Sequence, residues 1–441
     1  MANSIIDGIA DDAVHERQVP AFDEGKVSLR RFPYPYKAAI AICSDIDDTK
    51  TTEEFLEIQR FLNTKNVTSM GEGIGLEIGN SFWFYDNEGR FSYFTHDEHA
   101  RRVIADLIRA GYIDCLHTYG DGASSRDDIL RALEVLDRED CRLDVWVNHN
   151  GARNCLCRKF EYMFGECRGD DPGSDVYHAD VTLDYGIRFV WVGAMTRVIG
   201  QSPSTDPLSS LSTLLDPQYP LRSWVNMSKE IGKRAFGELR DERFVIHRLN
   251  QLTRVMQLED GQKVHEFIRY CNHPAGISAG GTSPGLSYVI SRRALEHLKA
   301  VQGFMIVYTH FGQNSGCQQV IPPETQETLR NLEREYRNGE IYVTTTSKLL
   351  HYYHASQYLA WSHQQTEGCT QIHIDHLDDP VFDKIIPAIE QLQGLTFYVP
   401  DSSKVEVYIR GVERKDIQHN PADDRGMESV TIPLTHLSFP Y

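Results

Sequence analysis

The stretch Lys37–Thr52, KAAIAICSDIDDTKTT, decides the fold prediction. Its first half, Ala38–Cys43, is an apolar run without alternation, which is typical of a parallel strand covered on both faces. Thr51 is followed three residues later by Glu54, and this capping box predicts that a helix starts directly after an acidic turn. A strand, a polar turn and a helix in this order place the carboxylates at the carboxyl end of a strand, where α/β folds keep their ligands.

The same unit of strand, polar loop and amphipathic helix recurs along the chain. Strands are predicted at Tyr112–Leu116, Leu143–Val147 and Phe304–Tyr308, and helices at Asp97–Ala110 and Ser125–Glu139. Such alternation predicts a parallel sheet or a barrel, so we expect an α/β fold.

The length of 441 residues allows one large domain and a smaller one. We expect a polar N-terminal arm over residues 1–30 and the barrel over residues 31–364. The Ser-, Pro- and Arg-rich stretch around 200–284 is interpreted as an insertion with helical patches, one of them at Lys263–Tyr270, and the last barrel helix is predicted at Ser347–Trp361. Short β-prone runs separated by turn residues predict a small all-β module over residues 365–441.

The composition restricts the class of partner. Lys and Arg total 45 against 63 Asp and Glu, a net charge of −18, which argues against nucleic acid or an anionic membrane surface. No stretch is apolar for long enough to span a membrane, and the first residues do not form a secretory signal. Nine cysteines without regular spacing predict free thiols and a cytoplasmic location.

Ionisable side chains follow four of the predicted strands. The residues concerned are Asp45, Asp47, Asp48, His117, Asp121, His149 and His310. Because all strand exits of a parallel barrel share one rim, we expect these side chains to converge. Three neighbouring carboxylates stay ionised most easily against a cation, and carboxylate with imidazole suits zinc, or else manganese, iron or cobalt.

Three of these segments carry a family resemblance. The stretch His117–Asp121 (HTYGD) resembles the H-T-x-S-H motif of polysaccharide deacetylases, the NodB-homology or carbohydrate esterase family four proteins. Ile46–Thr49 (IDDT) is similar to their T-F-D-D-G motif, and Tyr308–His310 (YTH) to their late L-x-H motif. The resemblance covers about Pro33–Trp361 and implies the distorted (β/α) barrel of that family.

The resemblance also implies roles for single residues. Asp47 would be the general base, and His310 the general acid for the leaving amine. Asp48 and His117 would be metal ligands, and Asp121 stands where the family has a second metal-binding histidine. With a divalent metal, such a site would deacylate an amino sugar or a related amide in a carbohydrate or glycoconjugate.

The chain also departs from the family pattern. Asp121 replaces a histidine, and the R-x-P-Y motif is absent, with Val147–Asn154 (VNHNGARN) nearby. His149 could complete the metal site, and Arg153 could orient a carboxylate. We expect the other polar residues of the rim to contact the substrate: Asp45, Tyr119, His149 and Arg153.

Two alternatives stay open at this point, and a homo-oligomer is compatible with either. The run Asp45–Thr49 (DIDDT) also fits D-x-D-x-T, the first motif of haloacid-dehalogenase-type phosphatases, in which Asp45 would be the nucleophile and magnesium the cofactor. The other alternative is a non-catalytic glycan-binding protein on a deacetylase scaffold, because fold alone does not decide activity.

Overall fold

The computed structural model describes residues 27–441 except 47, 89, 150, 158–165, 203–210, 240, 249, 314–318 and 367. An eleven-stranded sheet lies at the centre, in the order β10-β11-β8-β7-β6-β5-β2-β13-β12-β9, with β14 also paired to β2. Its strands are β2 (Ala38–Asp45), β5 (Gly79–Phe82), β6 (Ile113–His117), β7 (Val145–Val147), β8 (Phe189–Trp191), β9 (Met195–Thr196), β10 (Thr253–Gln257), β11 (Lys263–Phe267), β12 (Arg269–Tyr270), β13 (Phe304–Thr309) and β14 (Ile341–Thr344). Only the pairing of β10 with β11 is antiparallel among those described.

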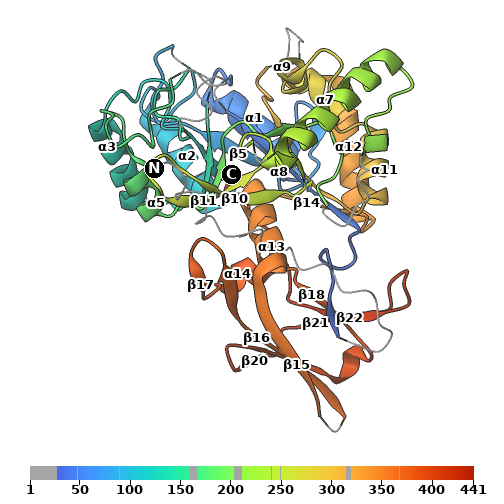
Figure 1. The fold of residues 1–441 in the computed structure, drawn as a ribbon. Helices are drawn as coiled ribbons and strands as arrows, with labels where there is room; N and C mark the ends of the chain where they lie inside the picture. The colour runs from blue at the N-terminus through green and yellow to red at the C-terminus, as the bar shows by residue number, and fades with distance from the viewer. Residues whose placement is uncertain are drawn as a thin grey trace, which may run out of the picture.

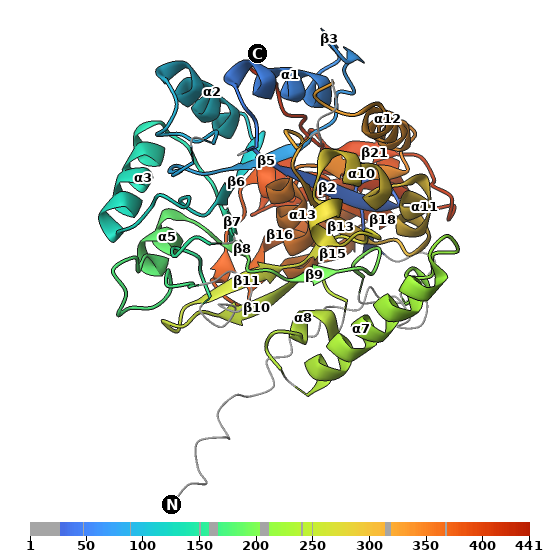
Figure 2. The same cartoon turned by 90° about the horizontal axis from the view of Figure 1, so that it is seen from above.

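Helices surround this curled sheet (Figure 2). They are α1 (Thr52–Asn63), α2 (Glu98–Arg109), α3 (Arg126–Arg138), α5 (Ala179–Tyr185), α7 (Pro220–Glu238), α8 (Val245–Arg248), α9 (Ile277–Gly280), α10 (Ser283–Val289), α11 (Arg292–Ala300) and α12 (Pro323–Arg337). The predicted helix starts are confirmed by their caps. The Glu54 N–H donates to Thr51 Oγ1 at 3.1 Å, and Ser125 and Asp128 form a capping box at α3.

A further helix, α13 (Thr346–Tyr358), closes the amino ends of the strands. The Ser347 N–H donates to Asp114 Oδ2 at 2.7 Å, and the Tyr353 ring packs on Phe304 with centroids 5.0 Å apart. Below the rim, the enclosed side of the sheet is filled by small and apolar side chains: Ala39, Ala41, Cys43, Cys115, Val145, Val147, Phe189 and Ile306. Because side chains alternate along a strand, the next residue on this side of β2 is Asp45 and of β6 is His117. The packed interior therefore ends in ionisable groups.

The C-terminal region contains two small sheets. One holds β15 (Leu359–Thr366), β16 (Cys369–Asp379), β17 (Asp383–Ile385), β19 (Val405–Ile409) and β20 (Val412–Arg414), and the other holds β1 (Ser28–Leu29), β18 (Thr396–Val399), β22 (Glu428–Thr431) and β21 (Gln418–Asn420). Figure 1 shows α13 running directly into β15. The helix predicted to reach Trp361 ends at Tyr358, because Leu359 and the residues after it pair with β16. The β region thus begins at residue 359, before the predicted boundary at 365.

Segments near the two ends of the chain connect the C-terminal β region with the central sheet. Residues 28–29 are not part of a loose arm: they pair with β18, Ser28 opposite Tyr398. At the other end, the Leu437 N–H donates to Glu77 Oε1 at 2.8 Å. The Tyr112 hydroxyl donates to the Leu437 carbonyl at 3.1 Å, so the C-terminal tail lies against the central sheet.

The predicted insertion around 200–284 contains three strands of the central sheet, β10, β11 and β12. The helix predicted at Lys263–Tyr270 is therefore wrong. Every residue from Val264 to Tyr270 is buried, and this segment pairs with β8, β9, β10 and β13. Pairing with these neighbours outweighs the local helical pattern. Among the described helices, none combines the length and apolarity needed to cross a membrane.

Candidate functional site

Three side chains from different parts of the chain meet at the carboxyl ends of the central strands. Asp45 ends β2, His117 ends β6, and His310 follows β13. Asp45 Oδ2 lies 3.8 Å from His117 Nδ1 and 3.6 Å from His310 Nε2. Asp45 and His117 are only 3 % and 4 % exposed. One buried carboxylate thus stands between two imidazoles.

The electrostatic environment favours the ionised form of the Asp45 carboxylate and the neutral form of the His117 imidazole. Burial alone would raise the pKa of Asp45, but the nearby His117, His310 and Arg269 side chains and a hydrogen bond from the Ser81 hydroxyl hold it below its ordinary value. Burial lowers the pKa of His117 to about 3, against the opposing effect of Asp45. An ionised carboxylate therefore lies beside a neutral imidazole, the protonation states that metal ligands need.

A second layer of aromatic and charged groups packs around His117. The Trp83 ring stacks on His117 with centroids 5.7 Å apart, and the His149 ring meets His117 edge-on at 4.8 Å. Asp121 Oδ1 lies 2.9 Å from His149 Nδ1, while Asp121 Oδ2 accepts from Arg90 at 2.8 Å. Both oxygens of Asp121 are thus engaged, and the carboxylate fixes the orientation of His149. A carboxylate behind a histidine is a common arrangement around metal ligands.

The loops after β2 and β13 complete the rim. His310 Nδ1 donates to the Gly281 carbonyl at 3.0 Å, so its Nε2 faces the two carboxylates. Asp48 Oδ2 lies 3.7 Å from His310 Nε2 and accepts a hydrogen bond from Gln313. Asp47, the predicted general base, lies outside the described residues.

Two predicted substrate contacts lie elsewhere. The Tyr119 side chain is fully buried, and its hydroxyl shares a hydrogen bond with Thr182 Oγ1 at 2.8 Å. Arg153 forms an ion pair with Asp175 at 2.9 Å on an exposed loop. Because it is buried, Tyr119 is a packing residue. Arg153 is held at the surface by Asp175.

Arg269 of β12 is a site residue that the sequence interpretation missed. Its side chain is 1 % exposed, and its guanidinium lies over Trp191 at 4.5 Å and Tyr308 at 5.3 Å. Its Nε and Nη2 atoms have no hydrogen-bond partner among the described residues. The β-branched and aromatic residues around it were the available signal for a strand, and the predicted helix obscured it. Arg269 supplies positive potential beside Asp45.

At the rim, the separation of Asp45 from each histidine can be compared with the spacing of metal ligands. Ligand atoms of a tetrahedral zinc site lie about 3.3 Å apart, given bonds of about 2.0 Å. The separations of Asp45 Oδ2 from His117 and His310 are slightly wider, and both residue types are suitable donors. Within the described part of the chain, three donors lie within 4.8 Å of one another only at two other places, Cys43 with Asp114 and Cys115, and His265 with His354 and Asp379. A third ligand at the rim would have to come from Asp48 or His149.

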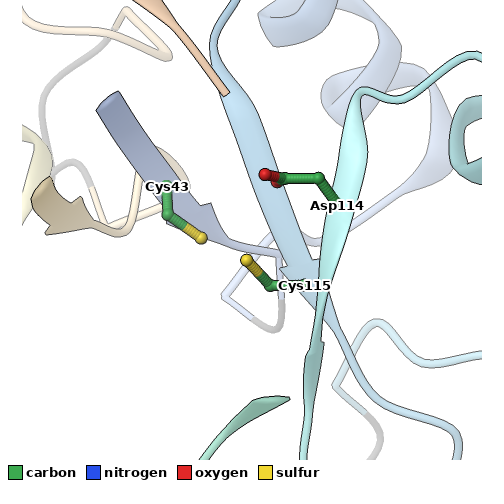
Figure 3. Close-up of side chains that lie close together, drawn as sticks. All are labelled: Cys43, Asp114 and Cys115. Carbon is green, nitrogen blue, oxygen red and sulfur yellow. The ribbon is translucent and has the colours of Figure 1, made fainter. Parts of the chain in front are cut away.

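The first of those clusters lies in the interior below the rim. Figure 3 shows the Cys43 and Cys115 sulfur atoms pointing toward each other from β2 and β6. Burial, Cys43 and Asp114 raise the pKa of the Cys115 thiol well above its ordinary value, and burial raises the pKa of Asp114 to about 7. A protonated thiol behaves as a small apolar group, so Cys115 belongs to the packed floor of the site.

No protein-family model matches the chain, and no curated protein matches it in sequence. Among solved structures, it is similar to a crystal structure of a mutant GH128 (subgroup I) endo-beta-1,3-glucanase from Amycolatopsis mediterranei in complex with laminarihexaose. The identity is 12 %, the TM-score is 0.25, and the match covers 67 % of this chain and 99 % of the other. A likeness at that level carries no argument about fold or chemistry. The class that the geometry itself defines is a mixed α/β protein with a polar site at the carboxyl ends of a curled parallel sheet.

Proposed function

We propose that this protein is a carbohydrate-acting hydrolase, and specifically a metal-dependent deacylase of an amino sugar or related amide. The observation that carries the proposal is the meeting of Asp45, His117 and His310 at one rim. The order of the three family-like motifs along the chain supports the same class. Because such a site is built from groups that hold a cation and move protons, it suits hydrolysis better than simple sugar binding.

His117 and Asp48 are the proposed metal ligands, with His149 as the third because Asp121 orients its ring. Zinc is the proposed ion, with manganese, iron or cobalt as alternatives. When bound, such a cation lowers the pKa of water and polarises an acyl carbonyl. His117 is neutral at physiological pH, so no proton has to leave before it can bind a cation.

His310 is the proposed general acid. Its Nδ1 proton is committed to the Gly281 carbonyl, which directs Nε2 toward Asp45 and Asp48. In the protonated form, this imidazole would give its Nε2 proton to a leaving amine. Asp47 is the proposed general base on the family resemblance.

Asp45 organises the site in this proposal. Its Oδ2 faces both imidazoles while Oδ1 accepts from Ser81, so the carboxylate fixes their relative positions. Trp191 is half-buried at the end of β8 beside Arg269, and an aromatic face with a cation behind it suits a sugar ring carrying an oxygen-rich substituent. If the protein is cytoplasmic, as its cysteines predict, the substrate is a soluble glycoconjugate.

The decisive experiment measures acetate release from N-acetylated amino-sugar oligosaccharides by protein of known metal content. We expect zinc-dependent release that is lost on chelation and restored by zinc. Magnesium-dependent phosphate release with a phosphoryl group trapped on Asp45 would replace the proposal with the phosphatase alternative. Binding of the oligosaccharides without any release, with or without metal, would replace it with the glycan-binding alternative.

A further inference from the structure

A second cluster of metal-ligand side chains lies at the opposite end of the central sheet from the rim. His265 belongs to β11, His354 to α13, and Asp379 is the last residue of β16. All three residues are buried, and their ligand atoms lie within 4.8 Å of one another. The cluster therefore joins three elements: the central sheet, the helix that closes it, and the first hairpin of the C-terminal region.

Asp379 presents both carboxylate oxygens to His265 and one of them to His354. Its Oδ1 accepts from the N–H groups of Val381 and Phe382 at 2.6 and 2.9 Å. Its Oδ2 lies 3.1 Å from His265 Nε2 and 2.7 Å from His354 Nε2. Both separations are somewhat shorter than the spacing of about 3.3 Å between ligands of a tetrahedral zinc ion, so a bound ion would move the three side chains slightly apart.

Hydrogen bonding alone does not satisfy the cluster. His354 Nε2 approaches Asp379 Oδ2 closely, yet it has no hydrogen bond of acceptable geometry among the described residues. A shared cation would use the lone pair of this nitrogen directly. The ion pairs recorded for Asp379 are with these two histidines, so a cation would also compensate its buried charge.

The surroundings of the cluster are aromatic. The Phe189 ring lies 5.7 Å from His265 and 5.8 Å from His354, and the Tyr358 ring lies 4.7 Å from His354. Phe382 covers His265 from the β16–β17 turn at 6.2 Å. An apolar shell limits the access of solvent and other ligands to an ion, which suits a stabilising role.

We propose that His265, His354 and Asp379 bind a zinc ion that fastens the C-terminal β region to the central sheet. Two imidazoles and one carboxylate are a donor set that zinc accepts, with one further position for a water molecule. The site is distinct from the rim, where Asp45, His117 and His310 lie. Its existence does not depend on the proposed hydrolase activity.

The test uses the His117→Ala protein, in which the proposed rim metal is removed. We expect this protein, loaded with zinc and desalted, to retain one equivalent of zinc per chain, and a further His354→Gln change to remove it. His351→Gln is the matched control, because His351 lies on the same helix but contacts Asp144. It should leave the zinc content unchanged. The proposal would be overturned if the His117→Ala protein retained no zinc, or if adding the His354→Gln change left its zinc content the same.

A second measurement does not depend on the folding of the His354→Gln protein. X-ray absorption at the zinc edge of the His117→Ala protein should show only nitrogen and oxygen ligands, with the signature of imidazole. Sulfur in the coordination shell would assign the ion to Cys43 and Cys115 and would overturn the proposal. Failure of acetate release with this zinc site intact would instead affect only the proposed function.

Discussion

Nε2 of His310 lies 3.6 Å from Oδ2 of Asp45, although Asp45 ends β2 and His310 follows β13. The strands β2 and β13 are parallel neighbours, with Tyr308 opposite Cys43, so their ends are level. This register fixes the distance between an imidazole and a carboxylate without any loop having to fold over the site. Side chains held by paired strands are positioned more rigidly than side chains on loops, as catalysis requires.

Replacing His117 by Ala should remove the metal at the rim. His117 is buried and neutral, and alanine offers no ligand in its place. We expect a loss of one metal equivalent and of acetate release, with an unchanged far-ultraviolet circular dichroism spectrum. His297→Ala on the outer helix α11 is the control and should change neither quantity. Full metal content and full activity in His117→Ala would remove His117 from the site.

Replacing His310 by Ala should separate binding from turnover. The rim ligands are left in place, so we expect the metal content to be that of the unmodified protein. The general acid is lost, and kcat should fall by roughly 10²–10⁴-fold. Steady-state acetate release at several pH values checks this, and the basic limb, where a general acid loses its proton, should disappear from the profile. A loss of metal without a change in the remaining rate per bound ion would make His310 a ligand instead.

Replacing Tyr119 by Phe tests whether this residue acts in packing or in substrate binding. The change removes one buried hydrogen bond to Thr182, which still shares a hydrogen bond with His178. We expect the free energy of unfolding to fall by about 0.5–1.5 kcal/mol and KM to stay the same. Urea denaturation and steady-state kinetics measure the two quantities. Unchanged stability with a large rise in KM would restore the substrate role predicted from the sequence.

Replacing Glu77 by Gln should alter the acid stability of the protein. Burial would raise the pKa of Glu77, but His436, Lys348 and the Leu437 N–H lower it to about 2. Because this folded-state pKa lies below the ordinary value, the stabilisation is complete above about pH 4.5 and is lost as the pH falls toward 2. A shift of this size corresponds to about 3 kcal/mol.

The unfolding free energy of the unmodified protein should therefore fall more steeply between pH 4.5 and 3 than that of Glu77→Gln, as measured by urea denaturation at each pH. Glu340→Gln is the control. Glu340 forms a partly exposed pair with Lys37, which should contribute less than about 1 kcal/mol. Parallel pH curves for the unmodified protein and Glu77→Gln would contradict the role of Glu77.

Local sequence patterns were sufficient to predict much of the fold. The unbroken apolar run of β2 predicted a doubly covered strand, and Thr51 and Ser125 predicted the starts of α1 and α3. The same reasoning about strand ends placed Asp45, His117 and His310 at one rim, where the structure has them. Their catalytic and metal-binding roles stay predictions.

Other features depended on contacts that no local pattern contains. The segment Lys263–Tyr270 became two strands because of its neighbours in the sheet, and Arg269 was missed with it. His265, His354 and Asp379 come from three separate elements, and nothing in their spacing indicates that they meet. The pairing of residues 28–29 with β18 likewise joins segments from the two ends of the chain.

That last pairing, together with the C-terminal tail lying on Glu77, means that each region completes the other. A fragment of residues 359–441 would lack one strand of its own sheet, and a fragment of residues 27–358 would lack His436 and Leu437, two of the partners of Glu77. Neither fragment would therefore be complete on its own. We expect the two regions to be degraded together, so that limited proteolysis of the intact protein releases no protease-resistant half.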